Sequence, residues 1–89
     1  MQLDAKLSIP PQVMSRLVGN ETVLLDLSSG VYFGLDGVGK RIWETVAEGL
    51  SLEETASVIT SEFDVEETRA QADVIEFVSN LVERGLLEA

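Results

Sequence analysis

The chain has 89 residues, 45% of them hydrophobic, and 16 acidic against 6 basic side chains give it a formal charge of −10. A chain of this length forms one small domain with one core, and no apolar run approaches the ~20 residues of a membrane span. Nucleic-acid-binding proteins gain affinity from lysines and arginines that neutralise phosphates, so the acidic excess argues against that class. We expect a single soluble domain, residues 1–89, whose partner is a polypeptide and not nucleic acid or a membrane.

Cysteine and histidine are both absent from the sequence. Their absence removes disulfides, thiolate nucleophiles, imidazole bases and the usual zinc ligands. The first eleven residues contain an acid and no long apolar stretch, so they do not read as a secretory signal. We expect a cytoplasmic protein that is not an enzyme and has no metal site and no cofactor.

The first half of the chain predicts short strands after an N-terminal arm, residues 1–11, that ends in two prolines. Turn residues at 19–21 (GNE) and 28–30 (SSG) separate the strands, and Gly30 can take the positive φ of a three-residue hairpin. An antiparallel meander is therefore expected. Its candidate strands are Val13–Val18, the apolar and partly β-branched Thr22–Leu27, and the aromatic Val31–Leu35.

From Asp36 onward, apolar residues recur at helical spacing and predict three helices. The first runs from a cap at Asp36 to Gly49. The second begins with a capping box at Ser51, and the third begins with the same device at Asp64 and stops near Gly85, before a short tail. The predicted fold class is α+β, with a three-stranded antiparallel sheet followed by three helices.

The stretch GLDGVGKR, Gly34–Arg41, has most of the glycine-rich pattern that holds nucleotide phosphates. In that loop, however, a Ser or Thr follows the lysine and binds magnesium, and the loop joins a buried parallel strand to a helix. Here Arg41 follows Lys40, the preceding strand is the second arm of a hairpin, and Asp36 would put a carboxylate where phosphate should lie. We interpret the stretch as a strand-to-helix junction.

Other groups of acids also fail to indicate chemistry. The segment from Asp64 has acids near calcium-loop spacing, but Arg69 occupies the position of the required glycine. Acid pairs in first helical turns are favoured by the helix dipole alone. No catalytic or metal-binding constellation remains.

Three strands beside three helices also raise the possibility of a winged-helix protein that binds DNA through its third helix. The predicted third helix, residues 66–84, carries five acids and two arginines, so it repels a phosphate backbone. The sheet edge is a better candidate, because unpaired backbone groups of Val31–Leu35 can pair with an extended peptide. Within that strand we expect Phe33 and Leu35 to be buried.

The order and spacing of several short motifs resemble the PqqD-like proteins, the peptide-recognition domains of pathways that make ribosomally synthesised and modified peptides. The resemblance extends over roughly residues 10–88. The matching features are the LLD strand, the SG-Y hairpin at 29–32, Leu35, Gly39, the IW pair at 42–43, FDV at 63–65 and the terminal L…GLL.

In that family the fold is a winged helix-turn-helix, and the leader segment of a precursor peptide pairs with the third strand while packing against the third helix. The resemblance therefore implies a peptide site between these two elements. Its residues in this sequence would be Val31, Tyr32, Phe33, Gly34, Leu35, Arg69, Ala70, Asp73, Val74, Phe77, Val78 and Leu81.

The resemblance is greatest to the free-standing leader-binding proteins of lasso peptide clusters, which present the precursor to a separate leader peptidase, and the chain length agrees with a stand-alone form. The implied function is a non-catalytic adaptor for the precursor leader. Delivery to a radical-SAM or another modifying enzyme is the alternative within the family. A winged-helix regulator or a generic protein-interaction domain is the alternative from another class.

Overall fold

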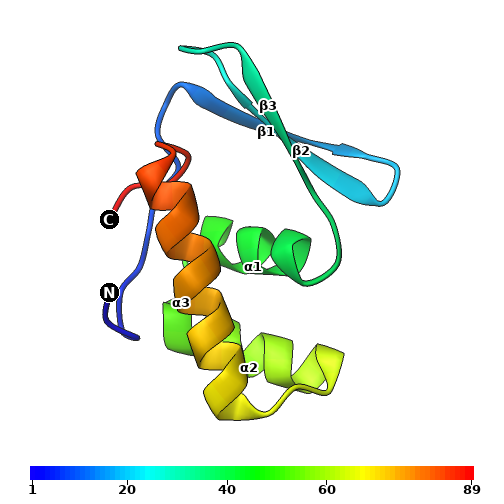
Figure 1. Cartoon of the computed structure of the whole chain (residues 1–89), viewed down its shortest axis with the longest axis vertical. Coiled ribbons are helices and arrows are strands. Elements are labelled where there is room, and N and C mark those ends of the chain that lie inside the picture. Colours follow the sequence, from blue (N-terminus) through cyan, green and yellow to red (C-terminus); the bar gives the residue numbers. More distant parts are fainter.

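The computed structural model covers residues 1–89 and places a small sheet against a group of three helices (Figure 1). This arrangement confirms the predicted α+β class and the order of three strands followed by three helices. No helix has both the length and the apolar character needed to cross a membrane. In chain order the elements are β1 (Val13–Val18), β2 (Glu21–Asp26), β3 (Val31–Leu35), α1 (Gly37–Ala47), α2 (Leu52–Phe63) and α3 (Glu67–Glu83).

The sheet is antiparallel with β2 in the centre, so β1 and β3 are both edge strands. The first hairpin turns through two residues and begins with Gly19 at φ 62°, as a type II′ turn requires. The second loop has four residues, Leu27–Gly30, where the sequence predicted three. Leu27 is excluded from the pairing with β3 because Asp26 already pairs with Val31. Gly30 has the positive φ that was predicted, 73°.

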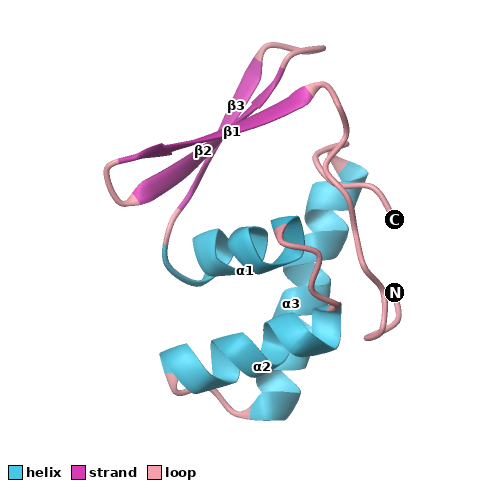
Figure 2. Cartoon of the chain, turned by 180° about the vertical axis from the view of Figure 1, so that it is seen from behind, coloured by secondary structure: helices cyan, strands magenta, loops and turns pink.

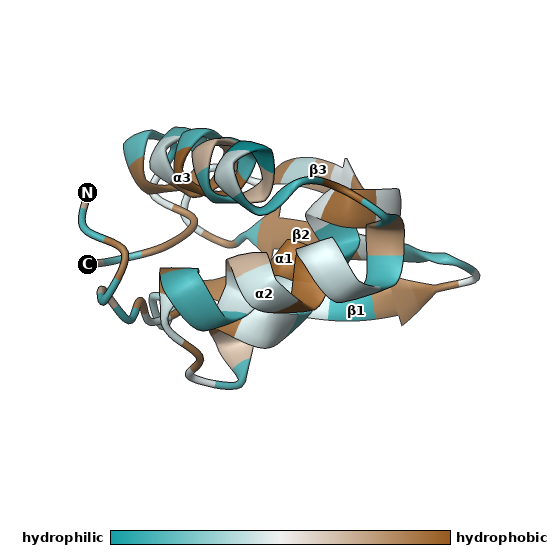
Figure 3. Cartoon of the chain, turned by 90° about the horizontal axis from the view of Figure 1, so that it is seen from below, coloured by the Kyte–Doolittle hydropathy of each residue, from teal (hydrophilic) through white to brown (hydrophobic).

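One face of the sheet packs on the helices, and the core lies between them. In Figure 3, α3 lies on the same side of the molecule as β3, and β1 lies on the opposite side. Leu24 at the centre of the sheet is fully buried in the same apolar cluster as Ile42 and Trp43 of α1, the helix that contacts β2. The buried apolar cluster comprises Leu7, Val13, Leu24, Leu35, Ile42, Trp43, Val46, Leu52, Ala56, Ile59, Ala70, Val74, Val78, Leu81, Leu86 and Leu87.

Both chain ends are part of this core, although the sequence predicted an N-terminal arm and a short C-terminal tail. Leu7, Leu86 and Leu87 are buried. The backbones of Ser8 and Glu88 exchange two hydrogen bonds of 2.9 Å, and Figure 2 shows the two terminal segments side by side. Local periodicity misses this contribution because the segments are too short to show a pattern and are buried only by each other and the helices.

The helix caps agree with the sequence at α2 and differ at α3. Ser51 accepts from the backbone N–H of Glu54, whose carboxylate accepts from the Ser51 N–H, so the predicted capping box is confirmed. The second predicted box is wrong. Asp64 ends α2 in the left-handed conformation, φ 54°, and Glu66 begins α3 without a side-chain cap. Aspartate tolerates this conformation better than most residues, so it serves as a stop signal here.

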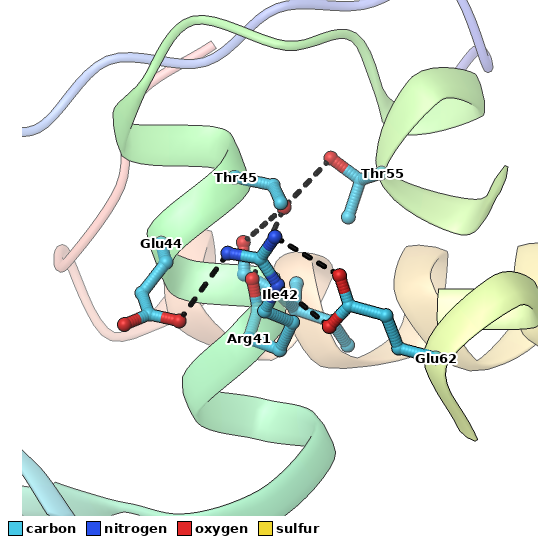
Figure 4. Close-up of polar contacts among 6 residues, drawn as sticks. All are labelled: Arg41, Ile42, Glu44, Thr45, Thr55 and Glu62. Carbon is cyan, nitrogen blue, oxygen red and sulfur yellow. Dashed lines mark hydrogen bonds and ion pairs between the residues drawn. The ribbon is translucent and has the colours of Figure 1, made fainter. Parts of the chain in front are cut away.

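Polar contacts tie α1 to α2 (Figure 4). The Arg41 guanidinium forms two hydrogen bonds of 3.0 and 3.1 Å with the Glu62 carboxylate, which raise the pKa of Arg41. In the buried layer beneath, the hydroxyls of Thr45 and Thr55 lie 3.1 Å apart. The Thr45 oxygen is also 2.9 Å from the Ile42 carbonyl, and because a hydroxyl has one proton, Thr45 donates to that carbonyl and accepts from Thr55.

Removal of the cap at α2 should cost stability measurably. We expect Ser51→Ala to lower the free energy of unfolding in urea by about 1 kcal/mol, because the amide of Glu54 loses its acceptor. Ser57→Ala is a matched control in the same helix, exposed and without a side-chain bond, and should be neutral or slightly stabilising. An equal loss in both variants would contradict the capping role.

The same cap makes stability depend on pH. The Ser51 N–H donates to the Glu54 carboxylate and lowers the pKa of Glu54 in the folded protein. A depressed folded-state pKa means that the contribution is present above the ordinary pKa of glutamate and is lost as the pH falls below that ordinary value and through the lowered one.

Candidate functional site

The free edge of β3 is defined by the register of the sheet. The Leu27 N–H donates to the Gln12 carbonyl at 2.8 Å, so these residues form a hydrogen-bonded pair that continues the β1–β2 ladder. Hydrogen-bonded and non-bonded pairs alternate in an antiparallel ladder, so Leu27, Leu25 and Val23 direct their backbone groups to β1. Leu24, between the last two, directs its backbone groups to β3 and forms a hydrogen-bonded pair with Phe33. The backbone N–H and C=O groups of Tyr32 and Gly34 therefore point away from the sheet, toward solvent.

Side chains of β3 alternate between the two faces of the sheet. Leu35 is buried on the face that meets the helices, as predicted from the sequence, but Phe33 on the same face is only partly buried. Tyr32 is 68% exposed on the opposite face. Gly34 has no side chain there, and the Glu21 carboxylate lies over its Cα. A strand that paired with β3 would accordingly present every second side chain to the helices.

A hollow of about 330 Å³ lies beside the end of β3, where the chain enters α1 and passes α3. Its floor is apolar. Gly39 in α1 allows α3 to approach closely, because a Cβ at this position would lie 3.0 Å from Cε1 of Phe77. The lining residues are Gly34, Leu35, Asp36, Val38, Gly39, Ile42, Asp73 and Phe77.

One stripe of α3 faces this groove. Asp73 and Phe77 line the hollow, and the Arg84 guanidinium lies 5.2 Å from the ring centroid of Phe33, within reach of a cation–π contact. Steps of four and seven residues keep Asp73, Phe77 and Arg84 on one side of a helix. The groove between β3 and α3, hereafter the β3–α3 groove, thus has acidic groups at its Leu35 end and a basic group at its Phe33 end.

Four of the α3 residues predicted for the site are in the core instead. Ala70, Val74 and Val78 have no exposed surface and Leu81 is 5% exposed, so their side chains cannot meet a peptide in this conformation. They pack into the core from the side of α3 that is next to the stripe formed by Asp73, Phe77 and Arg84. Of the predicted α3 residues, Asp73 and Phe77 line the groove, while Arg69 is largely exposed and 3.7 Å from Asp73.

The sequence patterns did not indicate Arg84 and Val38 as groove residues, or the buried Ile42 beneath the hollow, and they indicated Asp36 only as a cap. The signal for Arg84 was its seven-residue spacing from Phe77. Nothing local indicated Val38 and Ile42, because they reach the groove only through the packing of α1 against α3. Asp36 occupies the predicted N-cap position of α1 but makes no side-chain cap bond.

The glycine-rich stretch forms the predicted strand-to-helix junction. β3 is antiparallel to its neighbour and ends at Leu35, and Gly37 at φ 55° turns the chain into α1. Addition of ATP and magnesium should therefore leave the melting temperature unchanged, because a ligand of the native state must raise it. A saturable increase in a thermal-shift titration would show that the protein binds nucleotide and would contradict this expectation.

The sequence profile described as "Coenzyme PQQ synthesis protein D (PqqD)" matches residues 21–87. The chain belongs to the PqqD family. A comparison with curated protein sequences found no match.

Solved structures similar to this PqqD-family chain are complexes with leader peptides. "TbiB1 in complex with the TbiA(beta) leader peptide" is 39% identical, with a TM-score of 0.87 over 92% of this chain and 95% of that one. "Lasso peptide synthetase B1 complexed with the leader peptide" is 30% identical, with a TM-score of 0.89 over 96% of this chain and all of the other. The PqqD-like recognition element predicted from the sequence is thereby confirmed, as is the likeness to proteins of lasso peptide biosynthesis.

Proposed function

We propose that this PqqD-family chain is a non-catalytic adaptor that binds the leader segment of a ribosomally synthesised precursor peptide by strand addition. In this proposal the leader pairs with Tyr32 and Gly34 and packs its inward side chains against α3. The observation that carries the proposal is the free backbone edge of β3 beside an apolar hollow. Two relatives at 30% and 39% identity that hold leader peptides support it.

The whole chain, residues 1–89, would act as one recognition domain with a winged helix-turn-helix architecture used for peptide. The mutual pairing of Ser8 and Glu88 favours a single unit, because it joins the two ends over the same core. In the cytoplasm the adaptor would deliver the leader to a separate leader peptidase of a lasso peptide pathway. Delivery to a modifying enzyme is the alternative, and the rate of leader cleavage by the pathway peptidase, with and without the adaptor, distinguishes the two.

A winged-helix regulator is disfavoured by charge. Glu66, Glu67, Asp73, Glu76 and Glu83 are all exposed along or beside α3, and they would repel a phosphate backbone. Binding to duplex DNA at moderate salt, with no binding to a leader, would reverse this preference.

Binding should be visible residue by residue. On titration with the leader of the pathway's precursor, or with the TbiA(beta) leader as a probe, we expect amide shifts to concentrate at Tyr32, Gly34, Gly39 and Phe77. An affinity in the micromolar range or tighter, about −8 kcal/mol or better, suits a short strand that docks on a preformed edge. Shifts concentrated in α2 would place the site elsewhere.

A further inference from the structure

The hollow in the β3–α3 groove combines an apolar floor with negative charge at its rim. Val38 and Phe77 contribute apolar surface over the buried Ile42, and Asp36 and Asp73 contribute exposed carboxylates. Its volume of about 330 Å³ is at the lower end of ligand pockets. It is suited to one long side chain of a bound peptide and not to a separate small molecule.

Neither carboxylate is firmly neutralised within the protein. Asp36 makes no cap bond, and no lysine or arginine nitrogen comes within 4 Å of it. Asp73 is paired only with Arg69, at 3.7 Å, and the Arg69 side chain is 78% exposed. An exposed pair of this kind contributes little stability, so both carboxylates are available to a cationic ligand.

We propose that this hollow selects a lysine or arginine side chain of the bound peptide. The methylenes would lie against the apolar floor while the cationic end faces Asp36 and Asp73, since long basic side chains combine both properties. A purely apolar side chain would partly desolvate the two carboxylates without pairing them, which is unfavourable. The net charge of −10 also favours a basic peptide over an acidic one. The inference rests on strand addition at β3.

The charge at the other end of the groove fixes where the basic residue lies. Arg84 covers Phe33, so a second cation there would be repelled. Phe33 and Leu35 are two positions apart, and an added strand would place successive inward side chains at the same interval, about 6.8 Å. The basic side chain should therefore be two residues from the one that faces Phe33.

The test is a selection of random 12-residue peptides, displayed on their messenger RNAs, against three forms of the full chain. These are the wild type, Asp36→Asn with Asp73→Asn, and a charge-matched control, Asp4→Asn with Glu53→Gln. Both control residues are exposed and lie away from the groove: Asp4 is in the N-terminal segment, and Glu53 is in the first turn of α2, where its N–H donates to the Leu3 carbonyl. We expect one Lys/Arg position to be enriched on the wild type and the control and to be lost on the Asp36/Asp73 variant.

A selected peptide is then synthesised with its basic residue or with norleucine. Replacement of the basic residue by norleucine should weaken binding of the peptide to the wild type about fivefold. The same replacement should weaken its binding to the Asp36/Asp73 variant less than twofold. Enrichment of the same basic position on the Asp36/Asp73 variant, or norleucine binding as tight as lysine on the wild type, overturns the inference while leaving strand addition intact. Failure of the wild type to select any peptide would instead refute the proposed function.

Discussion

Replacement of Gly34 by proline is expected to abolish leader binding while the circular dichroism spectrum and melting temperature stay near those of the wild type. The Gly34 N–H points away from the sheet, so its loss removes no bond of the folded protein but deletes a donor to the added strand. Titration calorimetry should show at least a hundredfold loss, because the proline ring also blocks close approach of the leader backbone.

Three variants test the alternation on which this prediction depends. Gly34→Ala controls for the added Cβ, which displaces only the flexible Glu21 carboxylate, and should retain binding. Phe33→Pro removes an N–H that donates to β2, so it should destabilise the fold. Ser15→Pro places the same change at an outward position of the β1 edge. Loss of binding in Ser15→Pro, with retention in Gly34→Pro, would move the added strand to β1.

Val74→Asp is expected to unfold the protein. Val74 has no exposed surface, and an uncompensated carboxylate in the core should cost about 4 kcal/mol or more, a large part of the 5–15 kcal/mol that holds a small domain together. Urea denaturation should show a large decrease in the midpoint, or no folded baseline at all. A folded Val74→Asp protein with weak leader binding would instead place Val74 in the peptide site.

Phe77→Ala provides the contrast on the same helix. Phe77 is half-buried and lines the β3–α3 groove, so its truncation should leave the protein folded but lower the affinity for the leader by about tenfold or more. The pair of variants separates the core face of α3 from its groove stripe. Equal destabilisation by both substitutions would mean that Phe77 is a core residue and that the hollow is not a binding surface.

The sequence by itself predicted the elements whose causes are local. The segments Val13–Val18 and Val31–Leu35 are strands with the predicted bounds, and Gly30 has the predicted positive φ in the loop between β2 and β3. The capping box at Ser51 also depends only on residues three apart, so it could be recognised without the fold. The family resemblance then placed the candidate site between the third strand and the third helix.

Local sequence patterns gave wrong predictions where a residue type is found at both helix starts and helix ends, and where burial depends on segments distant in sequence. Asp64 resembles a helix start, but it ends α2 because the chain needs a left-handed residue there. Leu7 and Leu86 looked like parts of an arm and a tail, yet both are buried, since segments distant in sequence cover each other.

Only the tertiary structure decided which side of α3 is available to a ligand. Periodicity identifies Ala70, Val74, Val78 and Leu81 as an apolar stripe, but an apolar stripe can face a core or a groove, and the packing of α1 and α2 assigns it to the core. The sheet register likewise decided that Tyr32 and Gly34, and not Phe33, carry the free backbone groups, because the direction of an amide depends on the neighbouring strand and is not encoded by the residue that bears it.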